Sequence, residues 1–180
     1  MRTADELYAI EQAQVEVDHH TPTAGAMIGH ILSNLLLQQL KLNQARLTLS
    51  GNAQLFANQA LSSMYHETQD QFDELNQLML DEGEAIPTTT TEFLAYTFLH
   101  EDGALKYADA ETVLFDLAKA IDDQLMFVTR GIALADKENK FALAVFLRQL
   151  EGWLKHQRQQ IQLFLGHDVR EGLDDEDEDD

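Results

Sequence analysis

The sequence predicts an all-α fold, a four-helix bundle with a short extra helix in the long link between helices 2 and 3. Apolar residues recur every three, four or seven positions along four long stretches, as they do on one face of an α-helix. Neither of the two prolines lies in a helix interior, where it would break the helix. With 180 residues, 44% of them hydrophobic, the chain can bury one compact core but not two comfortable ones.

The first part of the chain divides into an arm and a long helix. Residues 1–21 are acidic and only partly periodic, which predicts an N-terminal arm or a short helix. The bundle, residues 22–166, is expected to start at Thr21-Pro22, with Thr21 as the N-cap and Pro22 as the first helical residue. A wide apolar face then continues to about Leu49, through Met27, Ile31, Leu32, Leu35, Leu36, Leu40 and Leu42.

The second helix carries two contrasting faces. Ser50-Gly51-Asn52 ends the first helix, and a new periodic stretch continues to about Glu82. Its core stripe consists of Leu61, Met64, Tyr65, Phe72, Leu75 and Met79. Its polar stripe consists of Asn58, Ser62, His66, Gln69, Asp70, Asp73 and Gln77. The first stripe predicts core packing, and the second meets water, a metal ion or another subunit.

The remaining elements follow from turn and cap signals. After Gly83 and Pro87, Thr89 and Glu92 have the spacing of a capping box for a short helix, residues 92–99. Asp109 is the expected cap of the third long helix, whose core stripe is Leu114, Leu117, Ala118, Ile121, Leu125, Val128 and Ile132. The fourth helix buries Phe146, Leu147, Leu150, Leu154, Ile161 and Phe164 and ends at Gly166. Residues 167–180, which finish DDEDEDD, are expected to form a disordered acidic tail.

Charge and composition exclude several functions. The formal net charge is −20, and the chain remains strongly acidic without its last seven residues, so it repels phosphate backbones and is not expected to bind DNA. There is no cysteine for a disulfide or a thiolate metal site. The N-terminus lacks a basic region followed by an apolar run, and no run is long enough to span a membrane. We therefore expect a cytoplasmic protein.

The second helix and the link after it carry a family likeness. The run FDELNQLMLDEGEAIPTTTTEF (Phe72 to Phe93), followed by a capped short helix and two long helices, resembles the Dps-type miniferritins of the ferritin superfamily. The resemblance covers about residues 22–166. It implies a ferritin-like bundle that assembles into a hollow dodecamer, oxidises Fe(II), typically with hydrogen peroxide, and stores the ferric product, with a role in stress protection. Many members also coat DNA with Lys-rich termini, which this chain lacks.

In this family the iron-oxidation site lies between two subunits. The resemblance implies a His late in the first helix and a His-x-x-x-Asp on the second from one chain, and an Asp-x-x-x-Glu from its mate. Carried across without gaps, these positions hold Arg46, Asn58, Ser62, Asp73 and Gln77. Only Asp73 keeps a ligand, and Arg cannot deprotonate to coordinate metal, so the usual site is expected to be weak or inactive.

Two other groups could bind a metal. If the second helices cross antiparallel as in the family, His66 and Asp70 meet their copies near the twofold axis and, with Asp73, could hold a divalent ion. The alternative is a set of hydrogen bonds between subunits. Glu16-x-x-His19, with Asp18 and His20 beside it, has carboxylate-imidazole spacing, but no second Glu-x-x-His exists to complete a di-iron site. A solvated arm is the alternative there.

Other residues favour ordinary roles, and three functions remain open. His156 lies between basic residues and is expected at the surface or an interface, and Trp153 is expected in the core. The hypotheses are a Dps-like shell that stores or sequesters iron, with weak or absent oxidation and possible co-assembly with an active relative; a purely structural shell; and an active ferroxidase with a non-standard site.

Overall fold

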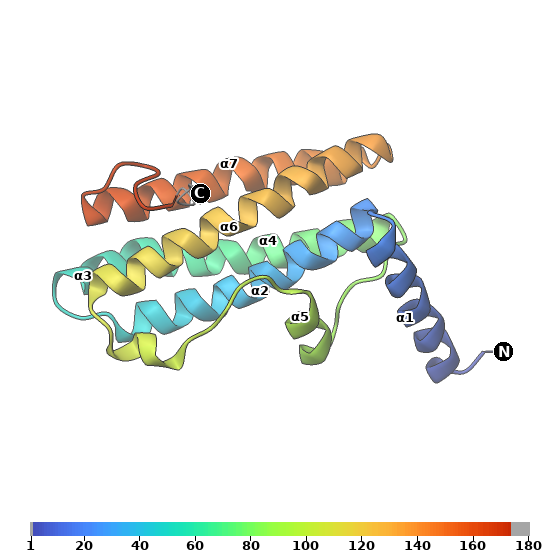
Figure 1. Cartoon of the computed structure of the whole chain (residues 1–180), viewed down its shortest axis with the longest axis horizontal. Helices are drawn as coiled ribbons and strands as arrows, with labels where there is room; N and C mark the ends of the chain where they lie inside the picture. Colours follow the sequence, from blue (N-terminus) through green and yellow to red (C-terminus); the bar gives the residue numbers. More distant parts are fainter. Residues whose placement is uncertain (1, 174–180) are drawn as a thin grey trace, which may run out of the picture.

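Four long helical segments form the body of the molecule (Figure 1). The computed structural model describes residues 2–173 and leaves out residue 1, residues 174–180 and the side chain of His19. The bundle consists of α2 (Ala24–Thr48), the continuous segment α3 (Asn52–Phe56), η1 (Ala57–Leu61) and α4 (Ser62–Asp81), then α6 (Ala110–Lys137) and α7 (Phe141–Leu165). The all-α bundle predicted from periodicity is therefore confirmed. No helix within residues 2–173 has the length and apolar character needed to cross a membrane.

The first bundle helix starts two residues later than predicted. Thr23, not Thr21, is the N-cap, because its hydroxyl accepts a hydrogen bond from the Ala26 amide at 3.1 Å. Thr21 instead ends α1 (Ala4–His20), and Pro22 lies in the connection between the two helices. Two threonines flank the proline, and both carry the same cap signal, so the sequence did not distinguish them.

The second bundle helix contains a π-helical turn, η1, that periodicity did not predict. Ser62 donates its hydroxyl to the carbonyl of Ala57, five residues earlier, at 3.2 Å. A π-helical turn has more residues than an α-turn, so it changes the angular relation between the residues before and after it. Asn58 lies inside this turn, and its orientation relative to Ser62 is therefore not that of an ordinary i, i+4 pair.

The long link carries two short helices, α5 (Thr90–Tyr96) and η2 (Gly103–Tyr107). The predicted capping box is present, because Thr89 and Glu92 exchange side-chain and backbone hydrogen bonds. The helix, however, starts and ends earlier than the predicted range 92–99. Asp109 caps α6 as predicted, with its carboxylate accepting from the Thr112 amide at 2.8 Å.

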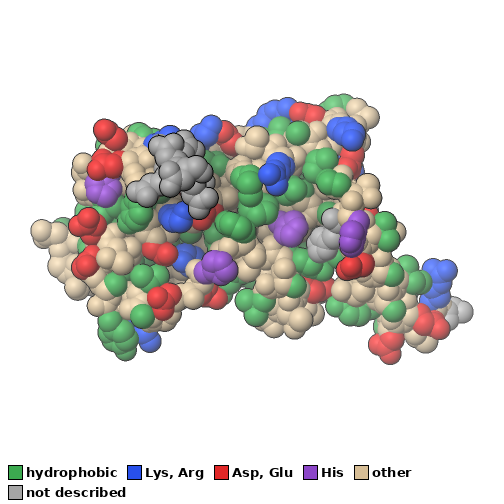
Figure 2. Space-filling view, viewed as in Figure 1, with side chains coloured by type: hydrophobic (Ala, Val, Ile, Leu, Met, Phe, Trp, Pro, Cys, Tyr) green, Lys and Arg blue, Asp and Glu red, His purple; other side chains and the backbone are tan. Residues whose placement is uncertain are grey.

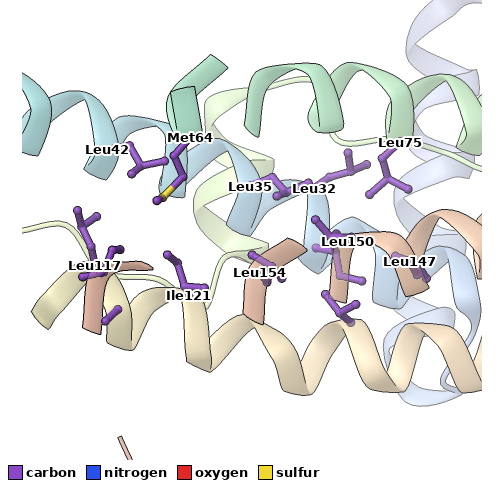
Figure 3. Close-up of a cluster of buried hydrophobic side chains, with 14 of the residues drawn as sticks. Leu32, Leu35, Leu42, Met64, Leu75, Leu117, Ile121, Leu147, Leu150 and Leu154 are labelled. Carbon is purple, nitrogen blue, oxygen red and sulfur yellow. The ribbon is translucent and has the colours of Figure 1, made fainter. Parts of the chain in front are cut away.

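One continuous apolar core joins the four long helices (Figure 3). Most predicted core residues are fully buried, among them Leu32, Leu35, Leu42, Met64, Leu75, Leu117, Ile121, Leu147, Leu150 and Leu154. Two predictions were wrong. Leu40 is 47% exposed because it lies about 200° around the helix from the buried Leu42. Phe164 is 40% exposed and stacks on Phe56 near the end of the bundle.

The N-terminal end of the chain is helical, one of the two predicted forms, whereas the C-terminal end departs from the prediction. Helix α1 projects from one end of the bundle (Figure 1). Residues 167–173, predicted as part of the disordered tail, instead fold back onto the bundle: Gln162 donates to the carbonyl of Glu171 at 2.9 Å, and Leu173 is 6% exposed. The stretch 174–180 of the predicted tail lies outside the described residues.

Candidate functional site

The three predicted metal ligands lie on one exposed face of α4. His66, Asp70 and Asp73 are all exposed, and their spacing of four and three residues places them within an arc of about 60° on an α-helix. Along the same face lie other exposed or half-buried polar residues, namely Ser62, Gln69 and Gln77. We call this set of residues, with Asn58 at its start, the α4 polar face.

The α4 polar face of one protomer does not make a metal site. Within a single protomer, no three of the described His, Asp or Glu side chains are grouped so that they could hold a metal ion together. His66, Asp70 and Asp73 point outward from a single helix, so any ion held there needs donors from a second molecule.

Arg46 lies beside this face with an incompletely satisfied guanidinium. The group sits over the ring of Tyr65, 4.4 Å from its centroid, and Nη2 donates to Asn43 Oδ1 at 2.8 Å. Its Nε is buried without a hydrogen-bond partner among the described residues. The side chain is half-buried and forms no ion pair within residues 2–173. A cation in this state has lost part of its hydration without gaining a counter-charge.

Three of the other positions aligned by the family resemblance carry neutral groups, and the fourth is Asp73. The Ser62 hydroxyl is directed to a backbone carbonyl of its own helix, and Gln77 donates to Asp81 Oδ1 at 2.8 Å. Asn58 is exposed on the π-helical turn. Asp73 is exposed and makes no hydrogen bond or ion pair with the rest of the described protomer. Fe(II) prefers carboxylate oxygen and imidazole nitrogen, so of these side chains only Asp73 suits it as a strong ligand.

The remaining candidates from the sequence are not brought together. In α1, His20 Nδ1 lies 2.8 Å from the carbonyl of Glu16, and Asp18 accepts from Gln14 at 2.9 Å. The side chain of His19 lies outside the description. His156 is exposed, and Trp153 is half-buried against the core, with Nε1 donating to Glu67 Oε2 at 2.5 Å.

Glu92 connects two helices, whereas its spacing from Thr89 predicted only a local helix cap. Its Oε2 accepts from the amides of Thr88 and Thr89 and from the Thr89 hydroxyl, each at 2.9 Å. Its Oε1 accepts from Tyr8 at 3.2 Å and Gln12 at 3.3 Å, both on α1. Burial by itself would raise the pKa of the Glu92 carboxyl, but these hydrogen bonds lower it below the ordinary value. One carboxylate thus holds α5 and α1 together.

A second charged cluster connects the ends of four bundle helices. Lys140 forms ion pairs with Glu84 and, at 3.1 Å, with Glu138, whose other oxygen accepts from the amide of Ala24 at 2.8 Å. Burial by itself would lower the pKa of Lys140, but the two carboxylates raise it above the ordinary value. No sequence signal connected these residues, since they come from three separate turns.

The middle of the bundle contains neutral polar groups. Gln124 donates to Gln38, which donates to the Thr68 hydroxyl at 3.3 Å, and all three residues are nearly inaccessible to solvent. This chain of amides and a hydroxyl has no carboxylate or imidazole that would suit iron. It is accordingly a hydrogen-bonded part of the core.

Solved structures of similar proteins place the chain in a family. The DpsB protein of Lactococcus lactis MG1363 is 39% identical, with a TM-score of 0.88, covering 93% of this chain and 96% of that one. The DpsA protein of the same organism is 32% identical, with a TM-score of 0.89, covering 94% and 99%. Dps from Listeria monocytogenes, 21% identical with a TM-score of 0.78 over 83% and 97%, shares the fold.

Two other comparisons gave no match. No family model matches this sequence. No curated protein matches it either. The two Lactococcus structures nevertheless exceed 30% identity over nearly the whole length of both chains, and they share the bundle described above. This chain therefore belongs to the Dps-type miniferritins, a branch of the ferritin-like proteins.

Proposed function

We propose that the protein forms a closed Dps-type shell, a homododecamer, in which α4 polar faces meet in antiparallel pairs across twofold axes. The α4 polar face supports this arrangement, because it is a stripe of exposed and half-buried polar side chains on a helix whose opposite face is buried in the core. In such a pairing Ser62 faces Asp73 of the partner subunit, and His66 faces the partner's Gln69.

We further propose that this shell stores or sequesters iron and protects against oxidative stress, while its own oxidation of Fe(II) is weak or absent. The observation that carries this proposal is the donor set at the paired face. Of five positions that supply ligands in the family, four hold Arg46, Asn58, Ser62 and Gln77, none of which provides a carboxylate or imidazole. Iron is the cargo here, and co-assembly with an active relative would provide the missing oxidation.

The experiment is aerobic Fe(II) addition to the assembled protein, with and without hydrogen peroxide, followed by the absorbance of ferric species. The proposal expects a rate near that of the buffer blank. A matched variant supplies the missing ligands through Arg46→His, Asn58→His, Ser62→Asp and Gln77→Glu, and it should oxidise iron much faster. Fast oxidation by the unmodified protein would contradict the proposal. Native mass spectrometry on the same samples tests the shell independently, and a monomer would overturn it.

A second candidate function is oxidation at a non-standard site. The exposure of His66, Asp70 and Asp73 on one face favours it, because their symmetry copies would bring six donors near one twofold axis. The double variant His66→Ala, Asp73→Ala separates the two candidates. Oxidation lost in that variant supports the non-standard site, whereas an assembled shell that neither oxidises nor retains iron supports a purely structural role.

A further inference from the structure

Arg46 has a charge that its own protomer does not balance. Its guanidinium is half-buried, stacked on Tyr65, and satisfied by a single hydrogen bond to the neutral side chain of Asn43. The buried Nε has no partner among the described residues. By contrast, the buried or half-buried cations Lys41, Lys140 and Arg158 each meet a carboxylate within the protomer. Although the formal net charge is −20, no carboxylate within residues 2–173 pairs with this half-buried cation.

Asp73 has the complementary property. Its carboxylate is exposed on α4 and has no hydrogen bond or ion pair with the described part of its own protomer. Within one protomer the Asp73 carboxylate is too far from Arg46 to form an ion pair with it. Arg46 lies at Tyr65, and Asp73 is eight residues further along α4, about 12 Å at 1.5 Å per residue.

Antiparallel pairing removes this separation. When Ser62 faces the partner's Asp73, Tyr65 is level with the partner's Asp70, and the partner's Asp73 lies three residues, about 4.5 Å, further along the axis. The guanidinium stacked on Tyr65 can span that distance to the arriving Asp73 carboxylate. Twofold symmetry produces the same contact twice, since each protomer supplies one cation and one anion. The face is therefore electrostatically self-complementary.

We propose that Arg46 of each protomer forms an ion pair with Asp73 of the partner subunit, so that a built-in guanidinium takes the place of a metal ion between the two chains. This inference rests on the proposed twofold pairing of α4. It assigns Arg46 a positive role: the cation neutralises a carboxylate of the partner subunit that would otherwise be buried at the paired face without a counter-charge. Asp73 is then engaged by protein and is not available to iron.

The test is a charge exchange in the full-length protein. Arg46→Glu alone and Asp73→Arg alone should each weaken association on the order of 30-fold or more, the effect of leaving one charge of a desolvated pair alone. The double variant Arg46→Glu, Asp73→Arg should recover most of the loss, because the pair is restored with reversed polarity. Lys155→Glu is the matched control, since Lys155 is an exposed cation on α7, and it should assemble normally. Association is measured by native mass spectrometry and light scattering over a dilution series.

A second measurement does not depend on stability. The chain has no cysteine, so Arg46→Cys and Asp73→Cys chains can be mixed and treated with a short bismaleimide. The inference expects covalent dimers in the mixture and far fewer with either chain alone. Circular dichroism and the fluorescence of Trp153, the single tryptophan, verify that each variant is folded.

The outcomes separate the inference from the proposed function. The Arg46–Asp73 pair is refuted, and the shell is not, if the unmodified protein assembles and the single variants assemble equally well. The same conclusion follows if the double variant shows no recovery and no cross-link forms. If the unmodified protein is a monomer, both are refuted. The pair is established if assembly recovers in the double variant and the cross-link forms only when the two cysteine variants are mixed.

Discussion

Replacing Glu92 by alanine tests whether one carboxylate holds two helices. The residue is 7% exposed and accepts five hydrogen bonds, three that close the start of α5 and two from α1. Glu92→Ala removes both acceptor oxygens and with them all five hydrogen bonds. It leaves the donors of Thr88 and Thr89 at the helix start without partners, and it frees Tyr8 and Gln12.

The expected cost follows from these contacts. Loss of a helix cap costs about 1 kcal/mol, and hydrogen bonds to a charged group contribute about 1.5–3 kcal/mol each when the group is buried. The two bonds from α1 are longer and come from side chains near the surface, so they add less. Together the change should lower the local stability of α5 by about 3 kcal/mol, and that of α1 by about 1 kcal/mol.

Hydrogen exchange of the assembled protein measures both helices separately. Amides of α5 should exchange on the order of 100-fold faster in Glu92→Ala, because each 1.4 kcal/mol is a factor of ten. Tyr8→Phe is the matched control, since it removes one bond from α1 and leaves the cap of α5 intact. It should speed exchange only in α1, by a few-fold.

The pH dependence supplies a second comparison. The folded-state pKa of Glu92 is lowered from its unfolded value of 4.5, so its stabilisation is fully present above that value and is lost as pH falls through the folded pKa. Protection of α5 should therefore decline below about pH 4.5 in the unmodified protein and much less in Glu92→Ala. Equal protection of α5 in the two proteins at pH 7, or parallel pH profiles, would refute the role assigned to this carboxylate.

Three further outcomes are expected. Lys140→Met should lower the free energy of unfolding by about 2–3 kcal/mol, because it leaves the carboxylates of Glu84 and Glu138 without their shared cation. The pKa of Lys140 is raised in the fold, so its stabilisation is complete below the unfolded value of 10.5 and is lost as pH rises through the folded pKa. An alkaline denaturation curve that is the same in Lys140→Met and the unmodified protein would contradict this. Gln124→Leu should cost about 1–3 kcal/mol in denaturant unfolding by leaving Gln38 unsatisfied in the core, and adding Gln38→Leu should recover part of that loss. Duplex DNA at low salt should show no gel shift, because acidic side chains are spread over the surface seen in Figure 2 and the described residues there form no continuous basic patch; a clear shift would show that the net charge misleads.

Features that depend on residues close together in the chain could be predicted from the amino-acid order. A cap needs partners within three residues, so the roles of Asp109 and of the Thr89–Glu92 pair could be predicted before any tertiary contact was known. Helical periodicity likewise identified the bundle and most of its core. The polar stripe of the second helix was also predicted, and the structure places His66, Asp70 and Asp73 on its exposed side.

What lies opposite each side chain depends on how whole helices pack against one another. Periodicity divides a helix into faces but does not state what covers them, so Leu40 was assigned to the core although it lies outside. Glu92 accepts hydrogen bonds from α1 residues 80 and 84 positions away, and the guanidinium of Arg46 stacks on the ring of Tyr65 but meets no carboxylate within residues 2–173. Such pairings arise from the packing of whole helices, because the geometry that brings two distant residues together is not encoded in the spacing of either one.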